Sequence, residues 1–283
     1  MTRSHRMWGA ALALAAAQGA AQAAIAPEAA QDLATKSGLW TQLDSLVPQV
    51  RAGMAAGIQR SPGQVSEAQQ ARMLACTQSA FTAETLRPPA LDAIAGTLQP
   101  RDVAPLLAWY DSALGRRIAT IEATSAQQTP DPQERLRRGG EALSGASEAR
   151  RASLQAILTE THSVDMMADT LIGMALAVQQ GLASADPAAA GTPVSELRAD
   201  LAARRPQVVA HYAQISLPAY AFTYLALSDD DLRQYADYLG TPAAMAFSDA
   251  TLRGVSRALG YGSVTLGRCL KAPEAPKAAS SGG

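Results

Sequence analysis

The sequence predicts an all-α protein made of two related helical-bundle halves, each containing a helix–joint–helix repeat. Hydrophobic residues make up 48% of the 283 residues, but aromatic residues only 5%. An alanine-rich core of this kind suits close-packed helices, since strands favour β-branched and aromatic side chains. Apolar residues recur at three- and four-residue spacing along most of the chain, and no long stretch alternates as a half-buried strand does.

The N-terminal segment 1–24 predicts a signal peptide. Arg3 and Arg6 precede an apolar run at 7–17, and Ala21-Gln22-Ala23 offers a small-x-small cleavage pattern. An ordinary N-terminal helix is the alternative. No other stretch of about 18 apolar residues follows, so no membrane span is expected. We therefore expect a periplasmic or secreted protein.

The rest of the chain divides at a polar stretch. We expect a first helical repeat domain at 28–125, a connector at 126–150 and a second helical repeat domain at 151–268. Gly139-Gly140 is the expected flexible point of the connector. A disordered tail is expected at 269–283, because this segment has few large apolar residues to bury.

The two halves share a pattern when positions 129 residues apart are compared. The matched pairs are Asp102 with Asp231, Trp109 with Tyr238, Ser112 with Thr241 and Ile118 with Phe247. Ser228 followed by Asp231 predicts a capping box at a helix start. Pro242, after the joint, suits the first turn of the next helix.

This pattern resembles the domain-of-unknown-function 2059 family of exported bacterial proteins. The first copy carries Asp102, Trp109-Tyr110, Ser112, Gly115 and Arg116, with Ala113 where the family has proline. The second carries Ser228, Asp231, Tyr238 and Thr241-Pro242, with Ala244 where the family has glycine. The resemblance covers roughly residues 31–257. It implies a helical fold and export, but no catalytic residue, since the family carries no established activity.

The two cysteines, Cys76 and Cys269, allow two interpretations. In an oxidising compartment they could form one disulfide that closes most of the chain. Alternatively, both are buried thiols that act as small apolar groups. Sequence alone leaves the choice open, because it does not show whether the two Cα atoms lie within bridging distance.

The charge balance and the lack of known catalytic motifs argue against several classes of function. With 24 basic and 25 acidic residues, the chain has no basic surplus to hold nucleic acid. It has neither a nucleophile elbow nor a phosphate loop, so no catalytic residue and no cofactor is expected. His162, Asp165 and Asp169 stand at helical spacing and are the metal-ligand candidates. A solvated helix face is the alternative for them.

The sequence therefore favours an exported, non-enzymatic binding or envelope-maintenance protein. Grooves between alanine-rich helices could accept an apolar ligand or a partner helix. The alternative is a metal-dependent envelope enzyme that uses the region of His162. The sequence identifies no ligand, partner or oligomeric state.

Overall fold

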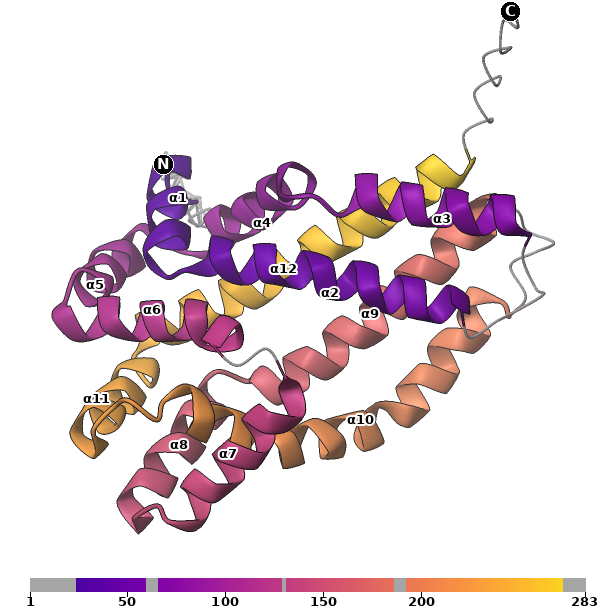
Figure 1. Cartoon of the computed structure of the whole chain (residues 1–283). Coiled ribbons are helices and arrows are strands. Elements are labelled where there is room, and N and C mark those ends of the chain that lie inside the picture. Colours follow the sequence, from indigo (N-terminus) through magenta and orange to yellow (C-terminus); the bar gives the residue numbers. More distant parts are fainter. Residues whose placement is uncertain (1–23, 60–65, 129–130, 186–191, 272–283) are drawn as a thin grey trace, which may run out of the picture.

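A computed structural model describes residues 24–59, 66–128, 131–185 and 192–271. These residues form twelve α-helices and no strand, which confirms the all-α prediction (Figure 1). The helices are α1 (Pro27–Lys36), α2 (Leu39–Gln59), α3 (Glu67–Ala80), α4 (Ala83–Thr97), α5 (Pro100–Tyr110), α6 (Ala113–Gln128), α7 (Pro132–Ser144), α8 (Glu148–Glu160), α9 (Ser163–Ala185), α10 (Val194–Thr223), α11 (Asp229–Leu239) and α12 (Pro242–Lys271). None of them is both long and apolar enough to cross a membrane.

Two clusters of buried apolar side chains hold the helices together. The first joins α1 to α5 with the C-terminal helix α12. The second joins α6, α8, α10 and α11. Helix α12, yellow in Figure 1, runs beneath the N-terminal helices and packs most extensively on α4 and α9. The first core is therefore built from both ends of the chain.

The predicted start of α11 carries the expected cap, and α5 carries a similar one. Ser228 Oγ accepts a hydrogen bond from the Asp231 backbone N–H at 3.1 Å, and Asp231 Oδ2 accepts one from the Ser228 N–H at 3.2 Å. At the start of α5, Asp102 Oδ2 accepts from the Gln99 N–H at 2.9 Å. Each cap satisfies backbone donors that the first helical turn leaves free, and contributes about 1 kcal/mol.

The two joints also use the same device. Ser112 Oγ accepts from the Gly115 N–H at 2.9 Å, and Thr241 Oγ1 accepts from the Ala244 N–H at 3.3 Å. A Cβ on Gly115 would lie 2.0 Å from the Trp109 carbonyl oxygen. The first joint is therefore too tight for any residue but glycine, whereas the second accommodates the buried methyl of Ala244.

The matched positions of the two joints meet in space. The rings of Trp109 and Tyr238 stack with centroids 4.0 Å apart and planes 6° apart. Beyond the joints the helices exchange partners: Ile118 of α6 enters the second core, and Phe247 of α12 enters the first. The sequence repeat and the division into two domains stay predictions.

The expectation that Gly139-Gly140 is a flexible point is wrong. Both glycines lie inside helix α7, which fills much of the expected connector. Gly139 is buried, and a Cβ there would lie 1.9 Å from the Pro218 carbonyl oxygen of α10. This glycine lets two helix backbones touch, because it has no side chain to hold them apart.

Cys76 and Cys269 form a disulfide in the structure, with Cα atoms 5.6 Å apart. It joins α3 to the last turn of α12, across 193 positions of sequence. Helix α12 extends to Lys271, so the first residues of the expected tail at 269–283 are helical. The remainder of that tail, like nearly all of the expected signal peptide, lies outside the described residues.

Candidate functional site

A pocket of about 380 Å³ opens where the two cores meet. We call it the Glu122 pocket and define it by its lining: Ser37, Leu39, Gln42, Tyr110, Glu122, Ser125, Thr161, Ser163, Met166, Tyr220, Thr223, Tyr224, Tyr235, Leu239, Phe247, Ser248, Thr251 and Leu252. Hydroxyl groups dominate this set, and side chains from both halves of the sequence contribute to it. Its volume falls within the range of about 300–1,000 Å³ that is usual for ligand sites.

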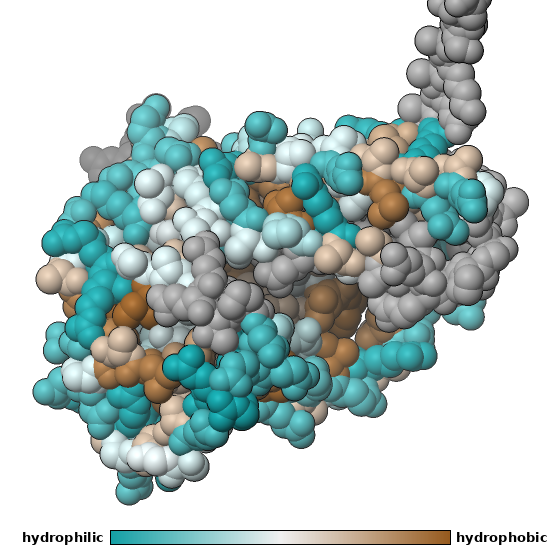
Figure 2. Space-filling model, viewed as in Figure 1, coloured by the Kyte–Doolittle hydropathy of each residue, from teal (hydrophilic) through white to brown (hydrophobic). Residues whose placement is uncertain are grey.

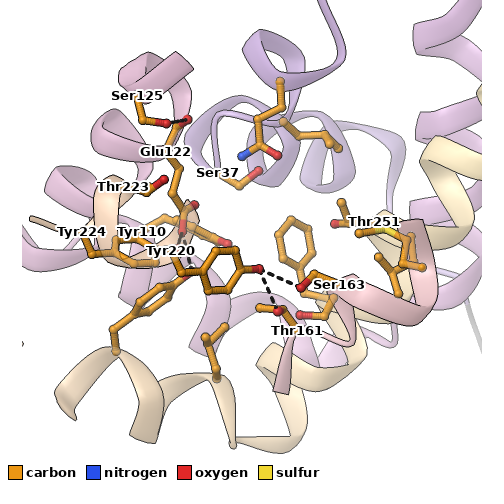
Figure 3. Close-up of a pocket in the computed structure, with 18 residues that line it drawn as sticks. Ser37, Tyr110, Glu122, Ser125, Thr161, Ser163, Tyr220, Thr223, Tyr224 and Thr251 are labelled. Carbon is orange, nitrogen blue, oxygen red and sulfur yellow. Dashed lines mark hydrogen bonds between the residues drawn. The ribbon is translucent and has the colours of Figure 1, made fainter. Parts of the chain in front are cut away.

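Glu122 is the acidic group of the pocket (Figure 3). Its Oε1 accepts hydrogen bonds from the Tyr224 hydroxyl at 2.6 Å and from the Tyr235 hydroxyl at 2.7 Å. Tyr224 and Tyr235 are themselves buried, and their rings meet edge to face at 5.8 Å. The carboxyl group is therefore held in one position by two fixed donors, which are charge-assisted when it is ionised.

Tyr220 lies beside Glu122, and its hydroxyl points towards Thr161 and Ser163 (Figure 3). Its hydroxyl donates to Ser163 Oγ at 2.9 Å and lies 3.1 Å from Thr161 Oγ1. Thr161 and Ser163 flank the joint between α8 and α9. His162, between them, adopts a left-handed backbone with φ of 47°. This joint turns both hydroxyl groups towards α10, at the cost of a backbone conformation that non-glycine residues seldom adopt.

Burial governs the electrostatics of the pocket. It raises the pKa of Glu122, and the hydrogen bonds from Tyr224 and Tyr235 oppose that shift. The pKa values of these two tyrosines are raised well above 10, first by burial and then by the nearby Glu122 charge. No Lys, Arg or His is among the residues that line the pocket. Glu122 is thus a half-buried carboxyl group without a cationic partner in the described part of the chain.

The predicted metal candidates do not gather into a site. Asp169 and Asp165 both pair with Arg205 of α10, at 2.7 and 2.8 Å. His162 is exposed and sits at the α8–α9 joint. In the described ranges no three His, Cys, Asp or Glu side chains are grouped as metal ligands would be. The two aspartates therefore tie α9 to α10, an ion-pair role on a solvated face.

Several residues of the sequence motif meet at a second, more open pocket of about 540 Å³. Its lining includes Asp102 and Trp109 from one copy, and Tyr238, Thr241 and Pro242 from the other. Ser228 and Asp231 instead form the cap of α11. Tyr110 is the one motif residue that lines the Glu122 pocket. Burial there raises the pKa of Tyr110 well above 10.

Comparison with known proteins identifies no relative: no family model, no curated protein and no solved structure matches the chain. The resemblance to the domain-of-unknown-function 2059 family stays a prediction.

None of the residues Glu122, Tyr220, Tyr224 and Tyr235 is among the candidates predicted from the sequence. One signal was available. Ile118, Glu122 and Ser125 share one face of α6, because they are separated by four and three residues. Since Ile118 is buried at 2% exposure, a carboxyl group on that face is expected to lie at least partly within the protein. The tyrosines come from α10 and α11, and sequence spacing does not reveal that they converge on it.

The surface also shows where apolar side chains gather. On the face in Figure 2, hydrophobic residues collect in a hollow over α9, between α2 and α10, and polar residues cover much of the remainder. Met167 and Leu171 of α9 are 38% and 39% exposed. The apolar surface is thus modest, and the polar Glu122 pocket is the better-defined site.

Proposed function

We propose that this is an exported, non-enzymatic binding protein that holds a small polar molecule in the Glu122 pocket. The observation that carries the proposal is the fixed array of Glu122, Tyr224, Tyr235 and Tyr220 around a preformed pocket. Binding sites typically combine apolar walls with a few precisely placed polar groups. Here Leu39, Leu239, Phe247 and other apolar side chains supply the walls, and the hydroxyl groups supply the polar contacts.

A binding role fits the state of these polar groups. Covalent catalysis requires a nucleophile beside a base that takes its proton. The hydroxyls of Thr161 and Ser125 donate to backbone carbonyl oxygens of their own helices, those of Ile157 and Glu122. Ser163 accepts from Tyr220 rather than contacting a histidine or carboxylate. This arrangement supports binding rather than covalent catalysis, and the predicted signal peptide and the disulfide support a periplasmic or secreted location.

Native mass spectrometry of the protein purified after export tests the proposal. Wild-type protein is incubated with an extract of envelope small molecules, desalted and weighed. A matched variant, Ser248→Leu, fills the pocket with a larger apolar side chain, since Ser248 lines it from α12 and is only half-buried. We expect a retained small-molecule mass on wild type that is lost in Ser248→Leu. A mass retained equally by both proteins, or by neither, would overturn the proposal.

A further inference from the structure

We infer that the Glu122 pocket selects a small organic cation, a molecule that carries a protonated amine. This inference rests on the proposed binding function and adds the chemical class of the ligand. Three properties of the wall support it: an unpaired carboxyl oxygen, a set of hydroxyl groups whose protons are already donated, and a lining of aromatic rings.

The first property is the state of Glu122. Its Oε1 receives both tyrosine hydroxyls, while in the described part of the chain Oε2 receives no hydrogen bond. No cationic side chain contributes to the shift of its pKa. Buried carboxylates in proteins are normally paired with a cation, because removing the charge from water is otherwise costly. A cationic ligand would supply the missing partner.

The second property is the direction of the hydroxyl protons. Tyr224 and Tyr235 donate to Glu122, and Tyr220 donates to Ser163. Thr161 and Ser125 donate to backbone carbonyl oxygens. The protons of these five hydroxyls are therefore used inside the wall, and their oxygens are left as acceptors. An ammonium group has three donors and no acceptor, so it matches them. An anion would have to use the remaining donors of the lining, such as the Thr251 hydroxyl and the Gln42 amide, and would face the Glu122 carboxyl group.

The third property is the aromatic lining. The rings of Tyr110, Tyr220, Tyr224, Tyr235 and Phe247 all line the pocket. Aromatic rings attract cations through the negative charge of their faces, and the attraction grows when the cation loses water. Neither a neutral polyol nor a carboxylate is stabilised by this cation–π attraction. The same wall thus favours a cation by charge, by hydrogen bonding and by ring electrostatics.

Three probes of the same length separate the charge classes: 4-aminobutan-1-ol, butane-1,4-diol and 4-hydroxybutanoate. Their binding to the exported protein is measured by calorimetry and by ligand-observed NMR at pH 7.5. We expect the amine to bind at least about ten-fold more tightly than the diol, and the carboxylate to bind least. Glu122→Gln should abolish that preference, since the amide keeps an acceptor for both tyrosines but carries no charge. Glu84→Gln, an exposed acid on α4, should leave it unchanged.

The outcomes separate the inference from the function on which it rests. Equal binding of diol and amine that Ser248→Leu removes would overturn the cation inference and leave the binding pocket in place. A preference for the amine that survives Glu122→Gln would also overturn the inference, because the selectivity would arise elsewhere. If no probe of any charge binds, the cation inference fails; if native mass spectrometry also finds no retained mass on wild type, the proposed function fails with it.

Discussion

Helix α7 carries two adjacent glycines whose environments are opposite. A Cβ on Gly139 would lie 1.9 Å from the Pro218 carbonyl oxygen and 2.7 Å from its carbonyl carbon. A Cβ on Gly140 would meet nothing within 4 Å. Since van der Waals contact needs about 3.5 Å, alanine at 139 must push α7 and α10 apart. Alanine at 140 requires no such movement.

The expected energies follow from these distances. Alanine is favoured over glycine in a helix by about 0.8–1 kcal/mol, so Gly140→Ala should stabilise the protein by up to that amount. Gly139→Ala gains the same propensity but introduces overpacking, which typically costs about 1–3 kcal/mol and more against rigid backbone. Because the clash is with backbone atoms, we expect a cost at the upper end of that range, about 3 kcal/mol; after the propensity gain is subtracted, Gly139→Ala should be destabilising by roughly 2 kcal/mol.

Urea denaturation and thermal melting of the two variants check this reasoning. A change of 1 kcal/mol corresponds to about 2–4 °C in Tm for a chain of this size. The two substitutions are identical in chemistry and differ only in the approach of α10, so the sign should differ between them. If both variants are stabilised, or both are unchanged, the close contact between α7 and α10 does not exist as described.

Three further predictions concern the disulfide, the acid and the joint. Replacing Cys76 and Cys269 with alanine should lower the free energy of unfolding by roughly 2–5 kcal/mol, as measured in urea. Reducing the wild-type protein should lower its stability by a similar amount; if reduction has no effect, the two cysteines are not bridged. Glu122→Gln should raise Tm at pH 7–8 but not below about pH 4.3, the usual carboxyl pKa. Burial raises the folded pKa of Glu122, so wild-type stability declines as pH rises through that folded value; parallel pH profiles for the two proteins would contradict this. At the left-handed His162, glycine should be tolerated, whereas His162→Val should cost about 1–2 kcal/mol; equal melting temperatures for these two variants would show that the joint does not hold this conformation.

Some features of the fold can be predicted from the sequence, because each depends on residues that are close together in the chain. Ser228 and Asp231 are three residues apart, and that spacing alone brings a side-chain oxygen to a free backbone N–H. The α-helical class follows similarly from apolar spacing at three and four residues. Asp102 caps α5 for the same reason.

The candidate site could not be predicted in this way. Glu122, Tyr220 and Tyr235 come from α6, α10 and α11, and no spacing rule relates them. The three metal-ligand candidates show the limit of helical spacing from the other side. Asp165 and Asp169 do share a helix face, as their spacing indicates, but both carboxylates form ion pairs with Arg205 of α10. A shared face predicts proximity within one helix and says nothing of the partner that packs against it.

The helical class, the Ser228–Asp231 cap and the helix–joint–helix pattern could be predicted from the sequence, since each depends on residues within a few positions of one another. The contact made by Gly139, the pairing of Cys76 with Cys269, and the approach of the Tyr224 and Tyr235 hydroxyls to Glu122 are visible only in the folded protein. These features depend on how helices distant in sequence pack together. That packing is set by the summed burial of many apolar side chains, to which no single motif corresponds.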